Sequence, residues 1–206
     1  MHEEKLDTDQ LLAEASAGDR SAALEVLQRC RPRLRQMVAM RLDPRVSARV
    51  DPSDVVQEAM AEALKKLPAY LRCPSVSFYP WLRSIAWERL VKLHRRHITA
   101  ARRSVRRERG LDLPLPDESV AALLDCLPAT GFAPSDRALR AELQARALEA
   151  LNELNDLDRD LLVMRYLEHM PIKEIAETLS LTPAATRMRH LRALEQLERI
   201  LSDPSV

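Results

Sequence analysis

The chain has 206 residues, of which 46% are apolar and 31% charged, and its 32 basic residues nearly balance its 31 acidic ones. This length allows one or two domains, and the apolar fraction argues against a chain that is disordered throughout. Only three glycines are present, which disfavours Gly-rich hairpins and Gly-dependent phosphate loops.

Helical patterns dominate the first part of the chain. Asp7 or Thr8 is the expected cap of a short helix that stops at Gly18. A second helical pattern of Ala, Leu and Val runs over 21–40, and Pro32 is expected to kink or break it.

A strong start signal for the next helix lies at Asp51, which caps it, with Pro52 in the first turn. We expect this helix to stop at Pro68. Residues 72–77 then form a short loop, whose last residue caps a long helix over 78–103.

Composition changes sharply over 110–136, which holds four Pro, five acidic residues and no Lys or Arg. This composition predicts an acidic linker. We therefore divide the chain into a first helical domain at 5–108, a linker at 109–134 and a second domain at 135–202. The apolar segment 120–127 either forms a short docked helix or stays part of the linker.

The second domain shows further helical patterns. Ser135 begins a helix that reaches residue 154, and a second helix over 157–167 is dense enough in Leu, Val and Met to be buried on most sides. A third short helix covers about 172–179, and Thr182 caps the last one. No strand pattern of any length occurs, so we predict an all-α fold of two small domains, the second a helix-turn-helix domain.

Basic and aromatic residues are concentrated rather than spread. Residues 86–109 hold nine Lys and Arg against two acidic residues, a local charge of +7, which favours a nucleic-acid partner over a membrane surface or an acidic protein. Five of the seven aromatic residues fall between 70 and 87, beside this run, where rings could stack on unpaired bases. For Trp81 we favour a place in the core. For Phe78 and Tyr79 both interpretations stay open.

The last helix can be assigned faces from its 100° repeat. Its buried face comprises Ala193, Leu194, Leu197, Ile200 and Leu201. Projected backward, that face falls on Thr186 and His190, and the opposite face carries small residues and arginines that could reach phosphates or guanines. The alternative is a helical hairpin used for protein contacts.

Catalytic and metal-binding signals are weak. His94 and His97 are spaced i,i+3 but lack a third ligand, and the neighbouring arginines would repel a cation. The three cysteines are far apart, without a CxxC pair, as expected in a reducing cytoplasm. No apolar run approaches the roughly 20 residues of a membrane span. We expect no catalytic residue, no metal, no cofactor, no membrane insertion and a cytoplasmic location.

Several motifs together resemble a bacterial RNA polymerase sigma factor of the sigma-70 family, of the extracytoplasmic-function (ECF) type that has regions 2 and 4. The segment DVVQE at 54–58 resembles region 2, as does WLRSIA at 81–86 followed by two arginines. The segments LLVMRY at 161–166, IKEIA at 172–176 and RMRHLRAL at 187–194 resemble region 4. The chain departs from the family pattern at Glu88, Lys92, Thr186 and His190.

The resemblance implies a transcription initiation factor with three sets of binding residues. Those expected to bind core RNA polymerase, at the β′ clamp helices, are Asp54, Val55, Gln57 and Glu58. Those expected to bind the −10 promoter element are Arg72, Ser75, Ser77, Phe78, Arg89, Lys92, Arg95 and Arg96. Those expected to bind the −35 element are Thr182, Ala185, Arg187, Met188, Arg189 and Arg192. The polymerase β flap and an anti-sigma factor are further partners implied by the family.

Two other classes of function were weighed. A stand-alone helix-turn-helix regulator with a helical effector or dimerisation domain would bind duplex DNA without polymerase, and it leaves the acidic segment at 54–58 without a role. A nucleic-acid-modifying enzyme would need a metal or nucleophile constellation, and the sequence offers none.

Overall fold

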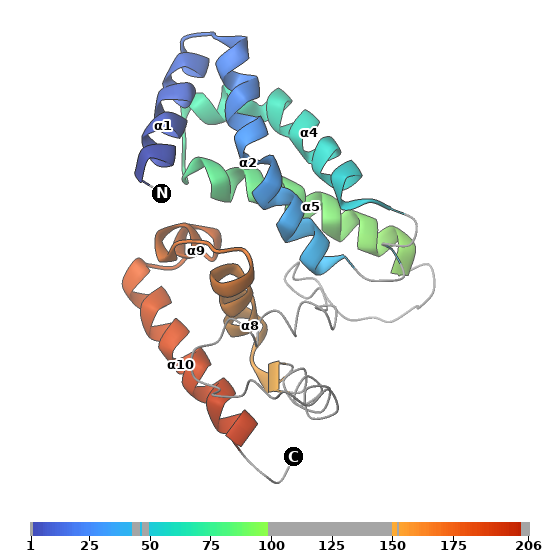
Figure 1. Cartoon of the computed structure of the whole chain (residues 1–206), viewed down its shortest axis with the longest axis vertical. Coiled ribbons are helices and arrows are strands. Elements are labelled where there is room, and N and C mark those ends of the chain that lie inside the picture. The colour runs from blue at the N-terminus through green and yellow to red at the C-terminus, as the bar shows by residue number, and fades with distance from the viewer. Residues whose placement is uncertain (1, 43–45, 47–49, 99–149, 152, 203–206) are drawn as a thin grey trace. The chain divides into compact units, whose positions relative to one another are not determined.

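The computed structural model describes residues 2–42, 46, 50–98, 150–151 and 153–202 (Figure 1). These residues divide into two compact units, the first drawn from Met1–Ala39 and Arg45–Ser104 and the second from Met40–Pro44 and Val105–Val206. Every element within the described ranges is helical, which confirms the predicted all-α fold. In chain order they are α1 (His2–Ser16), α2 (Arg20–Arg41), α4 (Pro52–Arg72), α5 (Phe78–Ile98), α8 (Asp156–Leu162), the π-helical turn η1 (Val163–Leu167), α9 (Ile172–Thr178) and α10 (Pro183–Ser202).

The core of the first unit is built on α4 and α5, which lie side by side and are joined by a five-residue loop (Figure 1). On α4, Val56, Ala59 and Ala63 are completely buried, at the spacing of one helix face. On α5, Leu82 and Leu90 are equally inaccessible to solvent. Each helix thus hides one apolar stripe and leaves the opposite face to water.

The starts of α2 and α4 follow local signals in the sequence, whereas the start of α1 does not. Asp51 caps α4 as predicted, because its side chain accepts a hydrogen bond from the backbone N–H of Ser53. An Asp carboxylate also caps α2, where Asp19 Oδ1 accepts from Ser21 N at 2.7 Å. The N-terminal helix α1 begins at His2, so the predicted caps Asp7 and Thr8 lie inside it.

One predicted helix end is wrong. Pro68 lies inside α4, which continues to Arg72, because the buried side chains of Leu67 and Tyr70 hold the last turn against the core. That burial outweighs the backbone hydrogen bond that a proline removes. For Pro32, a kink or a break was expected; it lies within a single helix, α2, so the break is excluded. The predicted stop at Gly18 is correct, since its φ of 102° is one that glycine adopts freely.

The second unit opens with a capped, acidic helix start. Asn155 Oδ1 accepts a hydrogen bond from Asp158 N at 3.0 Å, and two Asp residues in the first turn of α8 favour the positive end of the helix dipole. As predicted, the following segment is deeply buried, with Leu161, Leu162 and Val163 completely inaccessible. Its end is a π turn, in which Glu168 N donates to Val163 O at 3.1 Å.

The helix-turn-helix consists of α9 and α10, as predicted from the sequence. Ser180, at a φ of 56°, reverses the chain, and Leu181 N donates to Ala176 O at 2.8 Å. Thr182 Oγ1 then caps α10 by accepting from Ala185 N at 3.1 Å. The linker, the apolar segment 120–127, the helix expected from Ser135 to residue 149 and residues 99–103 of the long helix all lie outside the described residues.

Candidate nucleic-acid interface

The exposed edge of α4 carries the acidic motif. Asp54, Gln57 and Glu58 are all exposed, and their i, i+3, i+4 spacing places them on one face of the helix. Val55, the fourth residue expected to bind polymerase, is buried in the core. Three of the four predicted residues therefore form a surface, and the fourth helps to hold the helix that presents it.

Arg89 on α5 joins this acidic face to the basic helix. Its Nη1 lies 3.6 Å from Glu58 Oε2, and its Nη2 lies 3.4 Å from Glu62 Oε2. The pKa of Glu62 is lowered chiefly by a hydrogen bond from Lys66, with further attraction from Lys66 and Arg89. Glu62 is therefore ionised at neutral pH and competes for the Arg89 guanidinium. The sequence singled out Arg89 and Glu58 separately but did not pair them.

Beyond Arg89, α5 presents three further cations. Lys92, Arg95 and Arg96, all predicted to bind the −10 element, are exposed. His94, by contrast, is buried, so it lies away from that exposed surface. An exposed row of cations with no acid among its members suits the phosphates of a nucleic acid.

The loop between α4 and α5 lies against a cluster of three rings. Tyr70 and Trp81 stack with centroids 4.4 Å apart, and Phe78 lies 5.6 Å from Trp81 and 5.8 Å from Tyr70. Phe78 is only 5% exposed, so its ring belongs to this cluster and not to the free surface. Tyr79 is buried too, and Arg33 of α2 lies 3.6 Å from the centroid of its ring. Phe78 and Tyr79, for which base stacking and a place in the core were both open, therefore belong to the core.

The remaining loop residues differ in exposure. Arg72 and Ser75 are exposed, and Ser77 is half-buried. Tyr70 was not among the predicted site residues, although its hydroxyl donates to the Val76 carbonyl at 2.9 Å. The only hint in the sequence was its place among the clustered aromatic residues.

The outer face of α10 combines small, cationic and apolar side chains. Ala185, Arg187 and Arg192 are exposed, as is the capping residue Thr182. Met188 and Leu191 are each 52% exposed, which is uncommon for large apolar side chains. Leu191 was missed from sequence, although its i+3 spacing from Met188 could have signalled it. Small and apolar groups beside arginines suit base edges and thymine methyl groups in a major groove.

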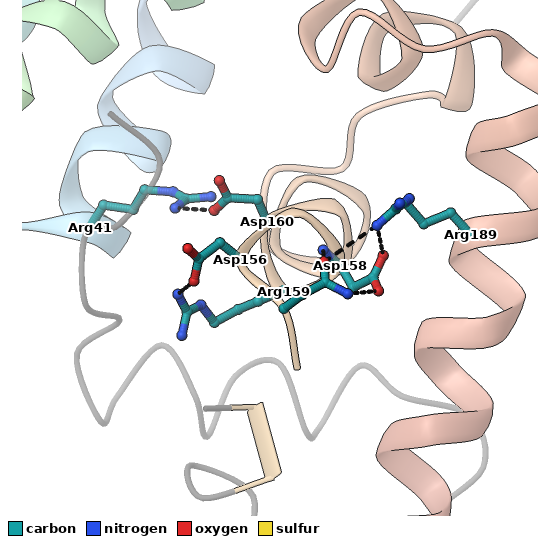
Figure 2. A network of polar contacts seen from close by, with 7 residues as sticks. Arg41, Asp156, Asp158, Arg159, Asp160 and Arg189 are labelled. Carbon is teal, nitrogen blue, oxygen red and sulfur yellow. Dashed lines mark hydrogen bonds and ion pairs between the residues drawn. The ribbon is translucent and has the colours of Figure 1, made fainter. Parts of the chain in front are cut away.

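Arg189, also predicted to read DNA, is held against the start of α8. Figure 2 shows its guanidinium directed at Asp158, with Nη1 2.8 Å from Asp158 Oδ1. The same Nη1 lies 3.3 Å from Asn155 Oδ1. In the same view Arg159 and Asp156 of α8 form a separate ion pair of 2.7 Å, and Arg41 pairs with Asp160 at 2.7 Å within the second unit. Arg189 thus ties α10 to the N-cap of α8.

Thr186 and His190 lie on the inner side of α10, as the helical repeat predicted. Thr186 is completely buried, and its hydroxyl donates to Thr182 O at 2.9 Å. His190 Nε2 lies 3.1 Å from the Tyr166 hydroxyl, and the two rings stack with centroids 5.6 Å apart. Burial, together with the positive charge of Arg165, lowers the pKa of His190. Both polar residues therefore have a hydrogen-bond partner on the inner side of α10, and Arg187 and Arg192 stay exposed on its outer side.

Within the described residues, no three His, Cys, Asp or Glu side chains gather in a way that could hold a metal ion. None of the helices in those ranges combines the length and the apolar character needed to cross a membrane.

Comparison with known proteins assigns both units to one family. Residues 26–99 match Sigma-70 region 2, and residues 144–197 match Sigma-70, region 4; together these segments make up more than half of the chain. The chain belongs to the sigma-70 family, and relatives of ECF type are among its matches.

Two curated relatives illustrate the similarity. The ECF RNA polymerase sigma factor SigD of Mycobacterium tuberculosis is 29% identical over 96% of this chain and 84% of its own length. The probable RNA polymerase sigma factor RfaY of Xanthomonas campestris is 30% identical over 94% of this chain, which spans 44% of that relative's length.

Among solved structures, CnrH in complex with the cytosolic domain of CnrY is 22% identical, with a TM-score of 0.55 over 97% of this chain and 99% of that one. At this identity the likeness concerns the fold alone.

Proposed function

We propose that the protein is a transcription initiation factor that binds core RNA polymerase and directs it to promoters through the −10 and −35 elements. The observation that carries this proposal is the presence, in one chain, of an acidic exposed edge on α4, a cationic row on α5 and a helix-turn-helix with a cationic outer face. The acidic edge has no role in a stand-alone DNA-binding regulator, even one that uses the first unit as an effector or dimerisation domain.

The acidic edge of α4, formed by Asp54, Gln57 and Glu58, is the proposed contact for the β′ clamp helices of the polymerase. Its carboxylates are exposed and close to one another, so they can meet basic side chains of a partner without a large desolvation cost. Val55 supports this edge from within the core.

The α4–α5 loop and the cations of α5 are the proposed contacts for the −10 element. Lys92, Arg95 and Arg96 are placed to bind phosphates, and Arg72 flanks the loop. Phosphate contacts position a strand without reading its sequence, so base preference is assigned to the loop itself. The polymerase supplies the catalytic site, and this chain needs none.

The outer face of α10 is the proposed reader of the −35 element. The side chains proposed to contact DNA on this face are those of Arg187, Met188 and Arg192. Ala185 and Thr182 lie near the helix start, the part of a reading helix that approaches base edges. Arg189 acts there indirectly, because its contacts with α8 fix the position of α10. The second unit is also the proposed contact for the β flap.

Transcription with purified core polymerase and a library of promoters tests the whole proposal. We expect promoter-specific transcripts only when this protein is added. Tight, specific binding to duplex DNA without polymerase, and no effect on transcription, would instead establish the stand-alone regulator.

We further propose that a protein inhibitor of the anti-sigma class controls this chain in the cytoplasm. The solved relative CnrH is described in complex with the cytosolic domain of CnrY, which supports a partner of this kind. Addition of such a partner should abolish transcription in the same assay and should compete with core polymerase for the chain.

A further inference from the structure

Tyr70 contacts both ends of the loop that joins α4 to α5. Its backbone carbonyl accepts a hydrogen bond from Cys73 N at 3.1 Å, at the C-cap of α4. Its hydroxyl donates to the carbonyl of Val76 at 2.9 Å, close to the start of α5. One residue therefore fixes where the loop begins and where it turns into the next helix.

The ring of Tyr70 is itself firmly anchored. It is 9% exposed and stacks on Trp81 of α5, with ring centroids 4.4 Å apart. The ring of Phe78 lies against it as well, with centroids 5.8 Å apart. The hydroxyl is therefore presented to the loop from a ring that packing already holds. An anchored donor restricts the Val76 carbonyl far more than a donor on a mobile surface side chain would.

The loop that Tyr70 shapes has an open outer side. Cys73, Pro74 and Ser75 are exposed, whereas Val76 is half-buried and Phe78 is buried. Of the rings beneath the loop, Tyr70 and Phe78 are buried and Trp81 is half-buried, so the cluster mainly supports the loop from below. The exposed outer side, which includes Ser75, is the part of the loop that an incoming base would meet.

We propose that Tyr70 is a positioning residue for the reading of one unpaired base of the −10 element. It sets the shape of the 73–77 loop before DNA arrives, so that the loop loses little conformational entropy when it closes on the base. The inference rests on the proposed function of this loop in −10 recognition. Tyr70 itself does not touch the DNA.

Replacement of Tyr70 by Phe keeps the ring and the stack and removes the hydroxyl, and with it the hydrogen bond to Val76. The assay uses holoenzyme reconstituted from the full chain and core polymerase. Its probe is a fork-junction promoter DNA with an unpaired −10 strand, randomised at one position at a time. We expect the preference for the favoured base at one position to fall about three- to ten-fold, the range that one lost hydrogen bond produces.

A merely structural role would give a different pattern. It would lower the thermal midpoint of the chain and weaken binding at every −10 position alike. The positioning role predicts an unchanged affinity for core polymerase and unchanged discrimination at the other positions. Tyr166→Phe is the matched control, because it also removes a part-buried hydroxyl contact, but on the second unit. It should leave the −10 preferences as they are.

The two levels of the proposal fail in different ways. If Tyr70→Phe retains the full base preference at every −10 position, or weakens all positions equally, the positioning role is wrong and the function of the loop stands. If the wild-type holoenzyme itself shows no base preference in the unpaired strand, the assignment of the loop to the −10 element is overturned, and the positioning role with it.

Discussion

Arg89 on α5 lies between two carboxylates of α4, with Nη1 3.6 Å from Glu58 Oε2. Glu58 belongs to the proposed polymerase contact and Arg89 to the proposed −10 contact, so the two surfaces meet at this pair. If polymerase binds Glu58 as proposed, one of the two acids beside Arg89 is engaged elsewhere. We then expect the guanidinium to be more available to a DNA phosphate, so that polymerase binding favours DNA binding.

Reversal of charge at Glu58 should weaken binding to polymerase. Glu58→Lys replaces an exposed carboxylate with an ammonium group on the proposed contact, and we expect about a ten-fold loss of affinity for core polymerase, or about 1.4 kcal/mol. Fluorescence anisotropy with labelled chain measures this, and circular dichroism checks the fold. Asp9→Lys, the same change of charge on exposed α1, is the control. Equal affinities for the two variants would contradict the role of the acidic edge.

Neutralisation of Glu62 should strengthen the binding of the holoenzyme to DNA that carries the −10 element. Its carboxylate accepts from Arg89 Nη2 at 3.4 Å, so Glu62→Gln leaves the guanidinium with one acidic neighbour fewer. Because the Arg89 side chain is about one-third exposed, we expect only a gain of about two- to three-fold in holoenzyme affinity for fork-junction DNA. The double variant with Arg89→Gln should lose this gain. Additive effects of the two changes would mean that the residues act independently.

The starts of α4 and α10 were predictable from sequence because their causes are local. Asp51 with Pro52, and Thr182 with Pro183, specify a cap and a first turn within a few residues. The end of α4 was not predictable in this way. It depends on the burial of Tyr70, whose partners Phe78 and Trp81 lie on the next helix.

The site was predicted as a set of residues but not as a set of contacts. The outer face of α10 followed from its helical periodicity, and the inner position of Thr186 followed from the same repeat. The partners of Arg89 and Arg189 did not, because they lie about 30 residues away along the chain. From sequence, Arg89 and Arg189 both looked like DNA contacts. The fold shows that Arg89 lies beside two carboxylates of α4, whereas Arg189 is held against the start of α8.

Arg189 and Arg192 should separate stability from DNA reading. Arg189→Ala removes the link to Asp158 and Asn155, so we expect a lower thermal midpoint, together with weaker use of −35 elements. Arg192→Ala changes an exposed residue, so the midpoint should stay constant while −35-dependent transcription falls. Calorimetry and transcription from templates with and without a −35 element measure the two effects. A loss of −35 use without any change in midpoint for Arg189→Ala would show that Arg189 contacts DNA directly.

Acid should destabilise the second unit through His190. Burial and the charge of Arg165 lower its pKa in the folded state, so the unfolded chain binds the proton more readily. The resulting stabilisation is complete above the unfolded pKa of about 6.5 and is lost as pH falls from there toward the folded value. Tyr166, whose pKa is raised by burial, does not titrate in this range.

Removal of the imidazole tests this dependence. In His190→Gln, the drop in thermal midpoint between about pH 7.5 and about pH 5.5 should be smaller than in the wild type. His169→Asn is the matched control: it removes an exposed histidine of the same unit, and asparagine tolerates the φ of 52° at that turn. The control should keep the wild-type pH profile. If His190→Gln also keeps it, protonation of His190 is not linked to unfolding, and the contact with Tyr166 serves only to hold the inner face of α10.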